Sequence, residues 1–120
     1  MDAQELTQRY ITIWNEADAV LRAEQVSALF APEARYVDPQ VDVSGTKAIS
    51  EMIGQVQAQF VGATFRVTGS PDGHHQQLRF SWELGQEGDS PAPIAGFDVA
   101  VMDEHGRIEL VLGFLDRVSA

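Results

Sequence analysis

The stretch IAGFDVAVMDEHGRIELVLGFLD (residues 94–116) decides the fold class, because it holds two strand-like runs around a single turn. Side chains of residues 94–102 and 107–116 alternate with a period of two, which is typical of strands. The DEHG sequence between the two runs supplies turn residues. The stretch therefore predicts an antiparallel β-hairpin.

A second hairpin is predicted directly upstream. Residues 64–69 and 76–84 alternate in the same way around SPDGH (residues 70–74), in which a proline, an aspartate and a glycine favour a turn. A shorter strand covers residues 34–38 and is closed by Pro39. These runs place most of the predicted strands in the second half of the chain.

Helical spacing of apolar residues dominates the first half of the chain. It predicts helices over Asp2–Ala17 and Ala19–Phe30, and a third that ends at Phe60 and is capped near its start by Ser44 or Thr46. The chain contains no repeat and no linker. Three helices followed by mostly antiparallel strands predict a single α+β domain over all 120 residues.

Composition excludes several classes of function. With 8 basic and 18 acidic residues the net charge is −10, which argues against a nucleic-acid partner and against binding to an anionic membrane surface. The absence of cysteine excludes disulfides, thiolate nucleophiles and cysteine-ligated zinc. The three histidines fall in or beside predicted turns, so we expect no metal site. Without an apolar signal segment or membrane span, the expected location is the cytoplasm.

The last predicted strand is apolar on both faces. One face carries Ile108, Leu110, Leu112 and Phe114, and the other carries Val111, Gly113 and Leu115. Helices can cover only one of these faces, and a strand that is apolar on both faces is normally buried on both. We therefore expect a homodimer that packs outer sheet faces together and buries about 1,200 Å² or more. The alternatives are a monomer with an exposed apolar patch, or a surface for another protein.

Two acidic residues fall where the predicted strands place apolar side chains. Asp98 shares a strand face with Ala100 and Met102, and Asp38 shares one with Tyr36. A carboxylate in an apolar site is costly unless it is paired or protonated. Both residues are therefore candidates for acid–base chemistry. Alternatively, each could bond a backbone N–H group or an arginine, or face water at an edge.

Three aromatic residues could join these acids. Tyr10 lies on the apolar face of the first predicted helix, where its hydroxyl needs a partner, either in a pocket or within the core. Trp14 lies on the same helix face and is expected in the core or beside the pocket. Trp82 shares a strand face with Phe80, so it is either a core residue or part of a pocket wall.

Four motifs resemble the nuclear-transport-factor-2-like superfamily, and within it the small SnoaL-like proteins. They are QRYITIWN (8–15), ALFAPEARYVDP (28–39), SGTKAI (44–49) and GFDVAVMDEHGRIELVLGFLD (96–116). The resemblance covers nearly the whole chain. It implies a cone-shaped, curved antiparallel sheet wrapped around the three N-terminal helices, with an internal pocket and commonly a dimeric assembly. The superfamily includes isomerases, polyketide cyclases and noncatalytic binding modules, so the fold does not name the reaction.

The resemblance to ketosteroid isomerase extends to single residues. Tyr10 follows an arginine on the first helix, Asp38 precedes a proline soon after ALFA, and Asp98 lies ten residues before the apolar residue that opens the last strand. By this resemblance Asp38 is the general base, and Tyr10 and a neutral Asp98 donate hydrogen bonds to an enolate oxygen. Such a reaction uses no cofactor and no metal.

The expected function is therefore a cofactor-independent isomerase or cyclase that moves a proton at an enolisable carbonyl of a small hydrophobic molecule. Seven residues are expected to line the pocket and contact the substrate: Trp14, Phe80, Trp82, Ala100, Met102, Val111 and Leu115. The alternatives are a noncatalytic module that binds a small ligand, and a dimeric interaction domain of the same fold.

Overall fold

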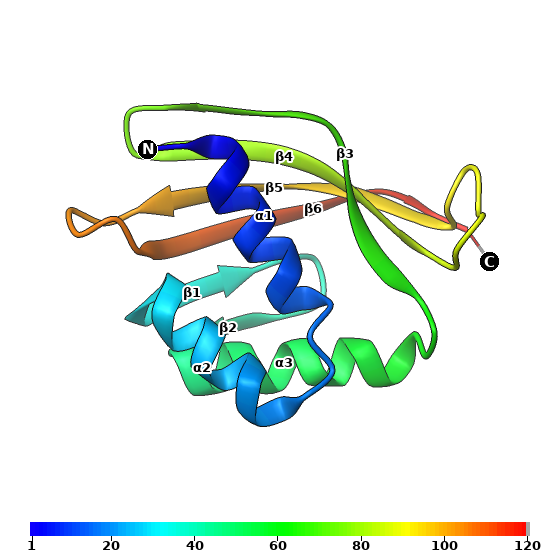
Figure 1. Ribbon diagram of the computed structural model, residues 1–120, viewed down its shortest axis with the longest axis horizontal. Helices are drawn as coiled ribbons and strands as arrows, with labels where there is room; N and C mark the ends of the chain where they lie inside the picture. Colours follow the sequence, from blue (N-terminus) through cyan, green and yellow to red (C-terminus); the bar gives the residue numbers. More distant parts are fainter. Residues whose placement is uncertain (120) are drawn as a thin grey trace.

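The chain forms a six-stranded sheet with three helices packed against it (Figure 1). The structure is a computed structural model that describes residues 1–119. In chain order the elements are α1 (Ala3–Trp14), α2 (Ala19–Leu29), β1 (Phe30–Val37), β2 (Asp42–Ser44), α3 (Thr46–Gln59), β3 (Thr64–His74), β4 (Gln77–Gly85), β5 (Ile94–Met102) and β6 (Ile108–Val118).

The sheet is mixed, curved and open, with the strand order β2-β1-β6-β5-β4-β3. All neighbouring strands are antiparallel except β1 and β6, which run parallel. The expected α+β class with three N-terminal helices is confirmed, and the parallel pair is an addition to it. A parallel pair needs a long connection between its strands, and here most of the chain lies between β1 and β6.

Helix α1 crosses the inner face of the sheet (Figure 1). Asp2 caps its start by accepting a hydrogen bond from the Glu5 N–H group. The helix ends before the predicted Ala17, because the Asn15 side chain bonds both the N–H and the C=O group of Phe65 in β3. These two bonds anchor the end of α1 to the sheet edge.

Arg22 of α2 joins the three helices from a buried position. Its guanidinium donates to the carbonyl oxygens of Glu16 and Ser50 and to Oε1 of Gln57. The Gln57 amide in turn donates to the carbonyls of Trp14 and Glu16, at the end of α1. Arg22 and Gln57 together therefore supply donors to the carbonyls at and just after the end of α1, where the helix itself offers none.

The first hairpin differs from its prediction. The SPDGH sequence lies within β3 rather than in the turn, and the chain reverses at His75, which adopts a φ of 55°. The pairing of β3 with β4 shifts between Thr68 and Asp72, and Pro71 lies in that shift. A proline has no N–H group to donate. At a position where the pairing is already interrupted, it therefore removes no hydrogen bond between the strands.

Two register shifts divide the side chains of β6 between its faces. Glu109 and Asp116 are extra residues relative to β5. The first shift places Ile108 on the inner face with Val111, whereas the simple alternation had grouped it with Leu110. Between the shifts, Gly113 faces inward, and Leu110, Leu112 and Phe114 face outward.

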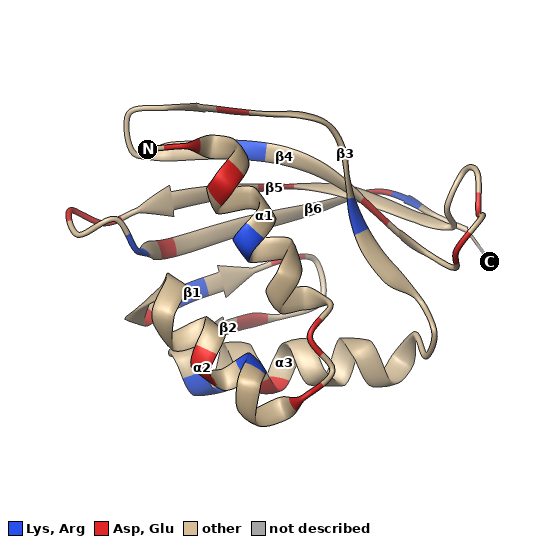
Figure 2. Ribbon diagram, in the orientation of Figure 1, with Lys and Arg blue, Asp and Glu red and all other residues tan. Residues whose placement is uncertain are grey.

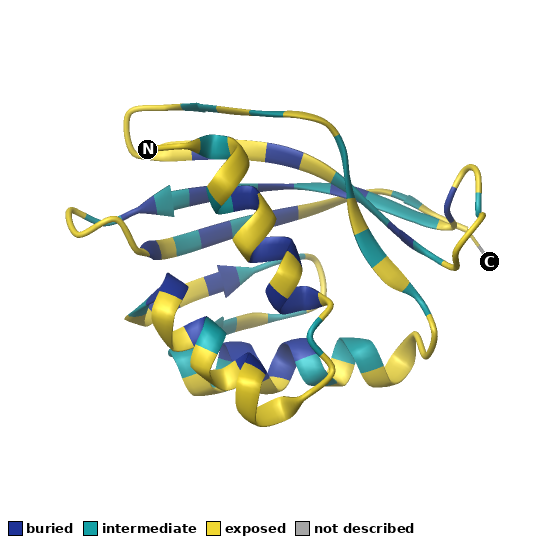
Figure 3. Cartoon of the chain, in the orientation of Figure 1, coloured by how far each residue is buried: buried dark blue, intermediate teal, exposed yellow. Residues whose placement is uncertain are grey.

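The core lies between α1, α2, α3 and the inner sheet face (Figure 3). Inner positions of β5 alternate with outer ones, so Asp98, Ala100 and Met102 are all buried. Charged residues are spread over the loops, the helices and the strands (Figure 2). Within residues 1–119, no helix combines the length and the apolar character needed to cross a membrane.

Candidate functional site

A cavity of about 110 Å³ opens at the end of the inner sheet face nearest the C-terminus of α3. Its wall is mostly apolar and includes Trp14, Phe65 and Leu115. Tyr10, Tyr36, Asp38, Trp82 and Asp98 contribute the polar groups considered below. They come from α1, from β1 and the residue after it, and from β4 and β5.

Asp98 is the most deeply buried carboxyl group of this site, with 4% of its surface exposed. Its Oδ2 accepts a hydrogen bond of 2.8 Å from the Tyr10 hydroxyl, and its Oδ1 accepts one of 3.0 Å from Nε1 of Trp82. Burial raises the pKa of Asp98 from 3.8 to about 6, although the Trp82 and Tyr10 hydrogen bonds oppose the rise. A pKa of about 6 lies close to neutral pH, and the neutral acid that the family resemblance implied stays a prediction.

Tyr10 is a buried residue of the cavity wall and packs edge-on against Phe80, at a ring-centre distance of 5.3 Å. Burial, and next the charge of Asp98, raises the pKa of Tyr10 well above its usual value. Its hydroxyl therefore stays protonated and acts as a donor to Asp98.

Asp38 lies just beyond the end of β1 and is only partly buried. Its Oδ1 accepts hydrogen bonds from the backbone N–H groups of Gln40 and Val41, at 2.8 and 3.0 Å. Its Oδ2 accepts one bond of 2.8 Å from the Tyr36 hydroxyl. A carboxylate oxygen can accept a second hydrogen bond, so Oδ2 keeps a free lone pair.

Tyr36 is a site residue that the sequence analysis did not single out as functional. It is 5% exposed and donates to Asp38 from the same strand face, two residues earlier. Burial, with further contributions from Asp98 and Asp38, raises the pKa of its hydroxyl. The period-two spacing of Tyr36 and Asp38 was the available signal, because it places both side chains on one face.

Two glycines create the space that the polar groups share. A Cβ atom on Gly113 would stand 3.0 Å from Oδ1 of Asp98, 3.3 Å from Cβ of Asp38 and 3.6 Å from the Tyr36 hydroxyl oxygen. A Cβ atom on Gly96 would collide with the indole of Trp82. Gly113 thus leaves the gap between the two acids open, and Gly96 lets the indole lie flat enough to reach Asp98.

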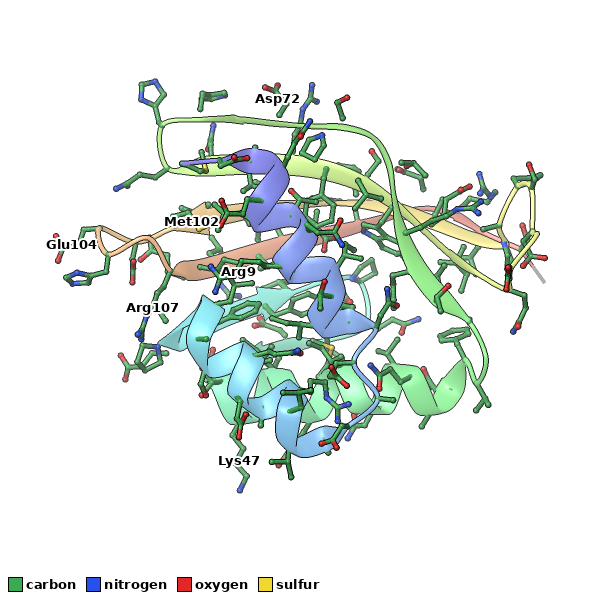
Figure 4. The ribbon with its side chains drawn as sticks, in the orientation of Figure 1. Arg9, Lys47, Asp72, Met102, Glu104 and Arg107 are labelled. Atoms are coloured by element: carbon green, nitrogen blue, oxygen red, sulfur yellow. The ribbon has the colours of Figure 1, made fainter. Side chains whose placement is uncertain are left out.

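The structure divides the predicted contact residues into two groups. Trp14, Trp82 and Leu115 line the cavity together with Tyr10, Asp38 and Asp98. Four other residues lie in the packed core and do not line it: Phe80, Ala100, Met102 and Val111. The reason is that α1 covers this half of the inner face. Met102 lies at the other end of β5, near the β5–β6 turn (Figure 4).

No group of three or more His, Asp or Glu side chains is placed to hold a metal ion within residues 1–119. The residues at the cavity can instead accept and donate protons. Two carboxyl groups with different surroundings, each bonded to a tyrosine hydroxyl, form an arrangement suited to acid–base chemistry.

Comparisons with known proteins agree with this fold. The model of the SnoaL-like domain matches residues 7–111. A structure of a candidate SnoaL-like isomerase from Agrobacterium tumefaciens is 38% identical, with a TM-score of 0.90, over 95% of this chain and 97% of that one. A search of curated proteins found no match.

More distant structures share the fold alone. A candidate polyketide cyclase from Sinorhizobium meliloti has a TM-score of 0.70 at 14% identity, over 94% of this chain and 99% of that one. An NTF2-like protein of unknown function from Exiguobacterium has a TM-score of 0.71 at 16% identity, over 92% and 98% of the two chains. The match to the domain model and the similarity to the Agrobacterium protein establish that this chain belongs to the SnoaL-like family, within the NTF2-like fold.

Proposed function

We propose that this protein is a cofactor-independent enzyme that moves a proton next to the carbonyl group of a small, mostly apolar molecule. The observation that carries the proposal is the presence of Asp38, Asp98 and Tyr10 around one apolar cavity. The candidate isomerase from Agrobacterium and the candidate cyclase from Sinorhizobium are consistent with it.

Asp38 is the base in this proposal. The two backbone N–H groups on Oδ1 and the tyrosine on Oδ2 hold it as an oriented carboxylate. The free lone pair of Oδ2 takes a proton from the carbon next to the substrate carbonyl, and the electron pair moves onto the carbonyl oxygen. An isomerase returns the proton at another carbon. In a cyclase, the enolate carbon attacks a second carbonyl of the same molecule.

Tyr10, and Asp98 in its protonated form, stabilise the negative charge that forms on the carbonyl oxygen. Donors of this kind contribute about 3–4 kcal/mol each when they are aimed at the developing charge in a site without water. Their hydrogen bond of 2.8 Å keeps Tyr10 and Asp98 together, and Gly113, which has no side chain, lies close to both Asp98 and Asp38. In this proposal, base and donors act on the two ends of one short carbonyl unit.

The substrate is a compact molecule. A cavity of about 110 Å³ is smaller than the roughly 300–1,000 Å³ of typical ligand pockets. Its apolar lining favours a single ring or a short chain with one oxygen. A larger molecule would extend past Phe60 and Leu115, two exposed side chains that line the cavity.

The proposal is tested with cyclohex-3-enone, a small ketone whose isomerisation to cyclohex-2-enone moves one proton and increases ultraviolet absorbance. We expect the protein to accelerate this conversion. Asp38→Asn should reduce the rate by about a hundredfold or more, because an amide cannot take up the proton. Binding of the product, measured by ligand NMR, should persist in the variant.

Asp42→Asn is the matched control, because Asp42 pairs with Arg35 on the exposed side of β2. It should leave the rate unchanged. Full activity of the Asp38→Asn variant would remove Asp38 from the role of base. If the protein binds the ketone and no substitution alters its slow background conversion, the noncatalytic binding module becomes the better description.

A further inference from the structure

The two oxygens of Asp98 have hydrogen-bond partners of different kinds. Oδ1 meets Nε1 of Trp82 at 3.0 Å, and an indole N–H group can only donate. Oδ2 meets the Tyr10 hydroxyl at 2.8 Å, and a hydroxyl can both donate and accept. The two oxygens therefore do not compete equally for a proton.

The ionised and the acid form of Asp98 use Tyr10 in opposite ways. A carboxylate can only accept hydrogen bonds, so the ionised form of Asp98 accepts the hydrogen bond of the Tyr10 O–H group. In the acid form, the indole N–H group needs an oxygen that carries no proton as its acceptor. Since Trp82 donates to Oδ1, the proton belongs on Oδ2. There it donates to the tyrosine oxygen, and the O–H group of Tyr10 is released toward another acceptor.

We propose that Trp82 is a positioning residue whose N–H group occupies Oδ1 of Asp98, so that a proton is taken up on Oδ2. This proton uptake turns the Tyr10 hydroxyl toward the cavity. An oxygen-bearing ligand then accepts a hydrogen bond from Tyr10, and its binding is coupled to the uptake of one proton from solution by Asp98. The inference deepens the proposed function, on which it rests for the carbonyl chemistry of the ligand.

The place of Trp82 in the sheet supports this role. Trp82 is paired across strands with Gly96, and only a glycine there leaves space for the indole. Asp98 lies two residues further along β5 on the same face, so the indole reaches it diagonally. The sheet itself therefore fixes the donor relative to the carboxyl group.

Within residues 1–119, no cationic side chain is among the groups that act on Asp98. The titratable groups that act on it are Tyr10 from α1, Tyr36 from β1 and Asp38 beyond β1. Neighbouring positions on β4 and β6 are Phe80 and Gly113, which carry no charge. No salt bridge therefore holds Asp98 in its ionised form, and the uptake of a proton breaks no ion pair.

The first experiment measures the titration of Asp98 directly, by NMR of protein labelled with ¹³C at the aspartate carboxyl carbon. Trp82→Phe removes the donor and keeps an aromatic side chain. It should raise the pKa of Asp98 by about one to two units, because hydrogen bonds to charged groups favour the charged form. If Trp82 only filled space, its loss would admit water, and the pKa would fall or stay the same. Either of those results would overturn the proposal.

The second experiment compares acetophenone, which has a carbonyl acceptor, with ethylbenzene, which has a similar shape and none. Acetophenone affinity, measured by calorimetry, should fall about tenfold between about pH 5 and pH 7.5, with uptake of a proton on binding. Ethylbenzene affinity should not change over this range. Tyr10→Phe should remove the pH dependence of acetophenone binding.

Asp98→Asn mimics the acid form, because its amide can accept from Trp82 and donate to Tyr10. It should bind acetophenone with high affinity that does not depend on pH. Equal pH dependence for both ligands, or an unchanged pH dependence in Tyr10→Phe, would contradict the inference even if Trp82→Phe did not fold. These binding and titration results do not depend on turnover, so loss of the proposed activity and failure of this inference are separate outcomes.

Discussion

The two acidic residues of the site show how neighbouring carboxyl groups acquire different properties. Asp38 is partly exposed and accepts from three donors, two of them backbone N–H groups. Asp98 is buried with one hydroxyl and one indole as its partners. Environments that differ in this way assign different tasks to chemically similar side chains.

The raised pKa of Asp98 predicts a pH-dependent cost of folding. Because the pKa rises from 3.8 to about 6 on folding, the contribution of Asp98 to stability is complete below pH 3.8 and is lost as the pH rises through 6. Asp98→Asn avoids this loss. Its free energy of unfolding, relative to the natural protein, should therefore increase by about 2–3 kcal/mol between about pH 4 and pH 8.

Urea unfolding at several pH values measures this difference. Ser27→Asn provides a comparison, because it changes an exposed residue of α2 and removes no titrating group. It should show no comparable change with pH. A stability difference for Asp98→Asn that stays constant from pH 4 to pH 8 would show that Asp98 titrates normally in the fold.

At this scale the sequence could predict which faces carry the acids and Tyr10, because period-two and helical spacing fix faces. It could not predict the hydrogen-bond partners. The bond from Trp82 to Asp98 runs diagonally between strands and depends on the missing side chain of Gly96. Such a contact depends on the register of β4 against β5, which the spacing within one strand does not reveal.

At the scale of elements, Arg22 is expected to stabilise the helical layer. It is buried, and its partners are neutral oxygens in the loop that follows α1 and in α3. Arg22→Met should lower the free energy of unfolding by about 2–4 kcal/mol, because it leaves buried acceptors without a partner. Thermal and urea unfolding measure this loss.

Arg9→Met is the control for this substitution, since Arg9 lies on the exposed side of α1. It should change the stability by less than about 0.5 kcal/mol. Equal effects of the two substitutions would mean that the bonds of Arg22 add nothing to the packing of the helices.

The two hairpins illustrate which parts of the sheet local sequence could predict. Ile94–Met102 is a strand over the predicted range, because regular alternation persists along its length. SPDGH contains turn residues, yet it lies in β3, because pairing with β4 continues past Asp72 to His74. The extra residues at Glu109 and Asp116 leave no local signal, since a shift is defined only against the partner strand.

At the scale of the whole molecule, no helix within residues 1–119 covers the outer sheet face. Phe97 and Phe114 stack there with ring centres 4.9 Å apart, and Phe114 is 50% exposed. Val99 pairs with Leu112 beside them. We propose that a second copy of the chain packs on this face and that the dimer buries about 1,200 Å² or more.

Sedimentation velocity tests the dimer. Leu112→Lys places a charge on the face and should produce monomers at concentrations where the natural protein is dimeric. Ser27→Lys adds the same charge at an exposed position of α2 and should not change the assembly. A natural protein that remains monomeric at all concentrations would contradict the proposal.

The hydrogen bond between Tyr10 and Asp98 joins positions 88 residues apart in the chain. A ribosome that adds about 5–20 residues per second needs on the order of 5–15 s to deliver the second partner after the first. β6, which supplies Gly113 and joins β1 to the rest of the sheet, follows later still. A nascent chain that ends before β5 lacks both Asp98 and Gly113, so the proposed proton-transfer centre assembles only after residue 113 has been added.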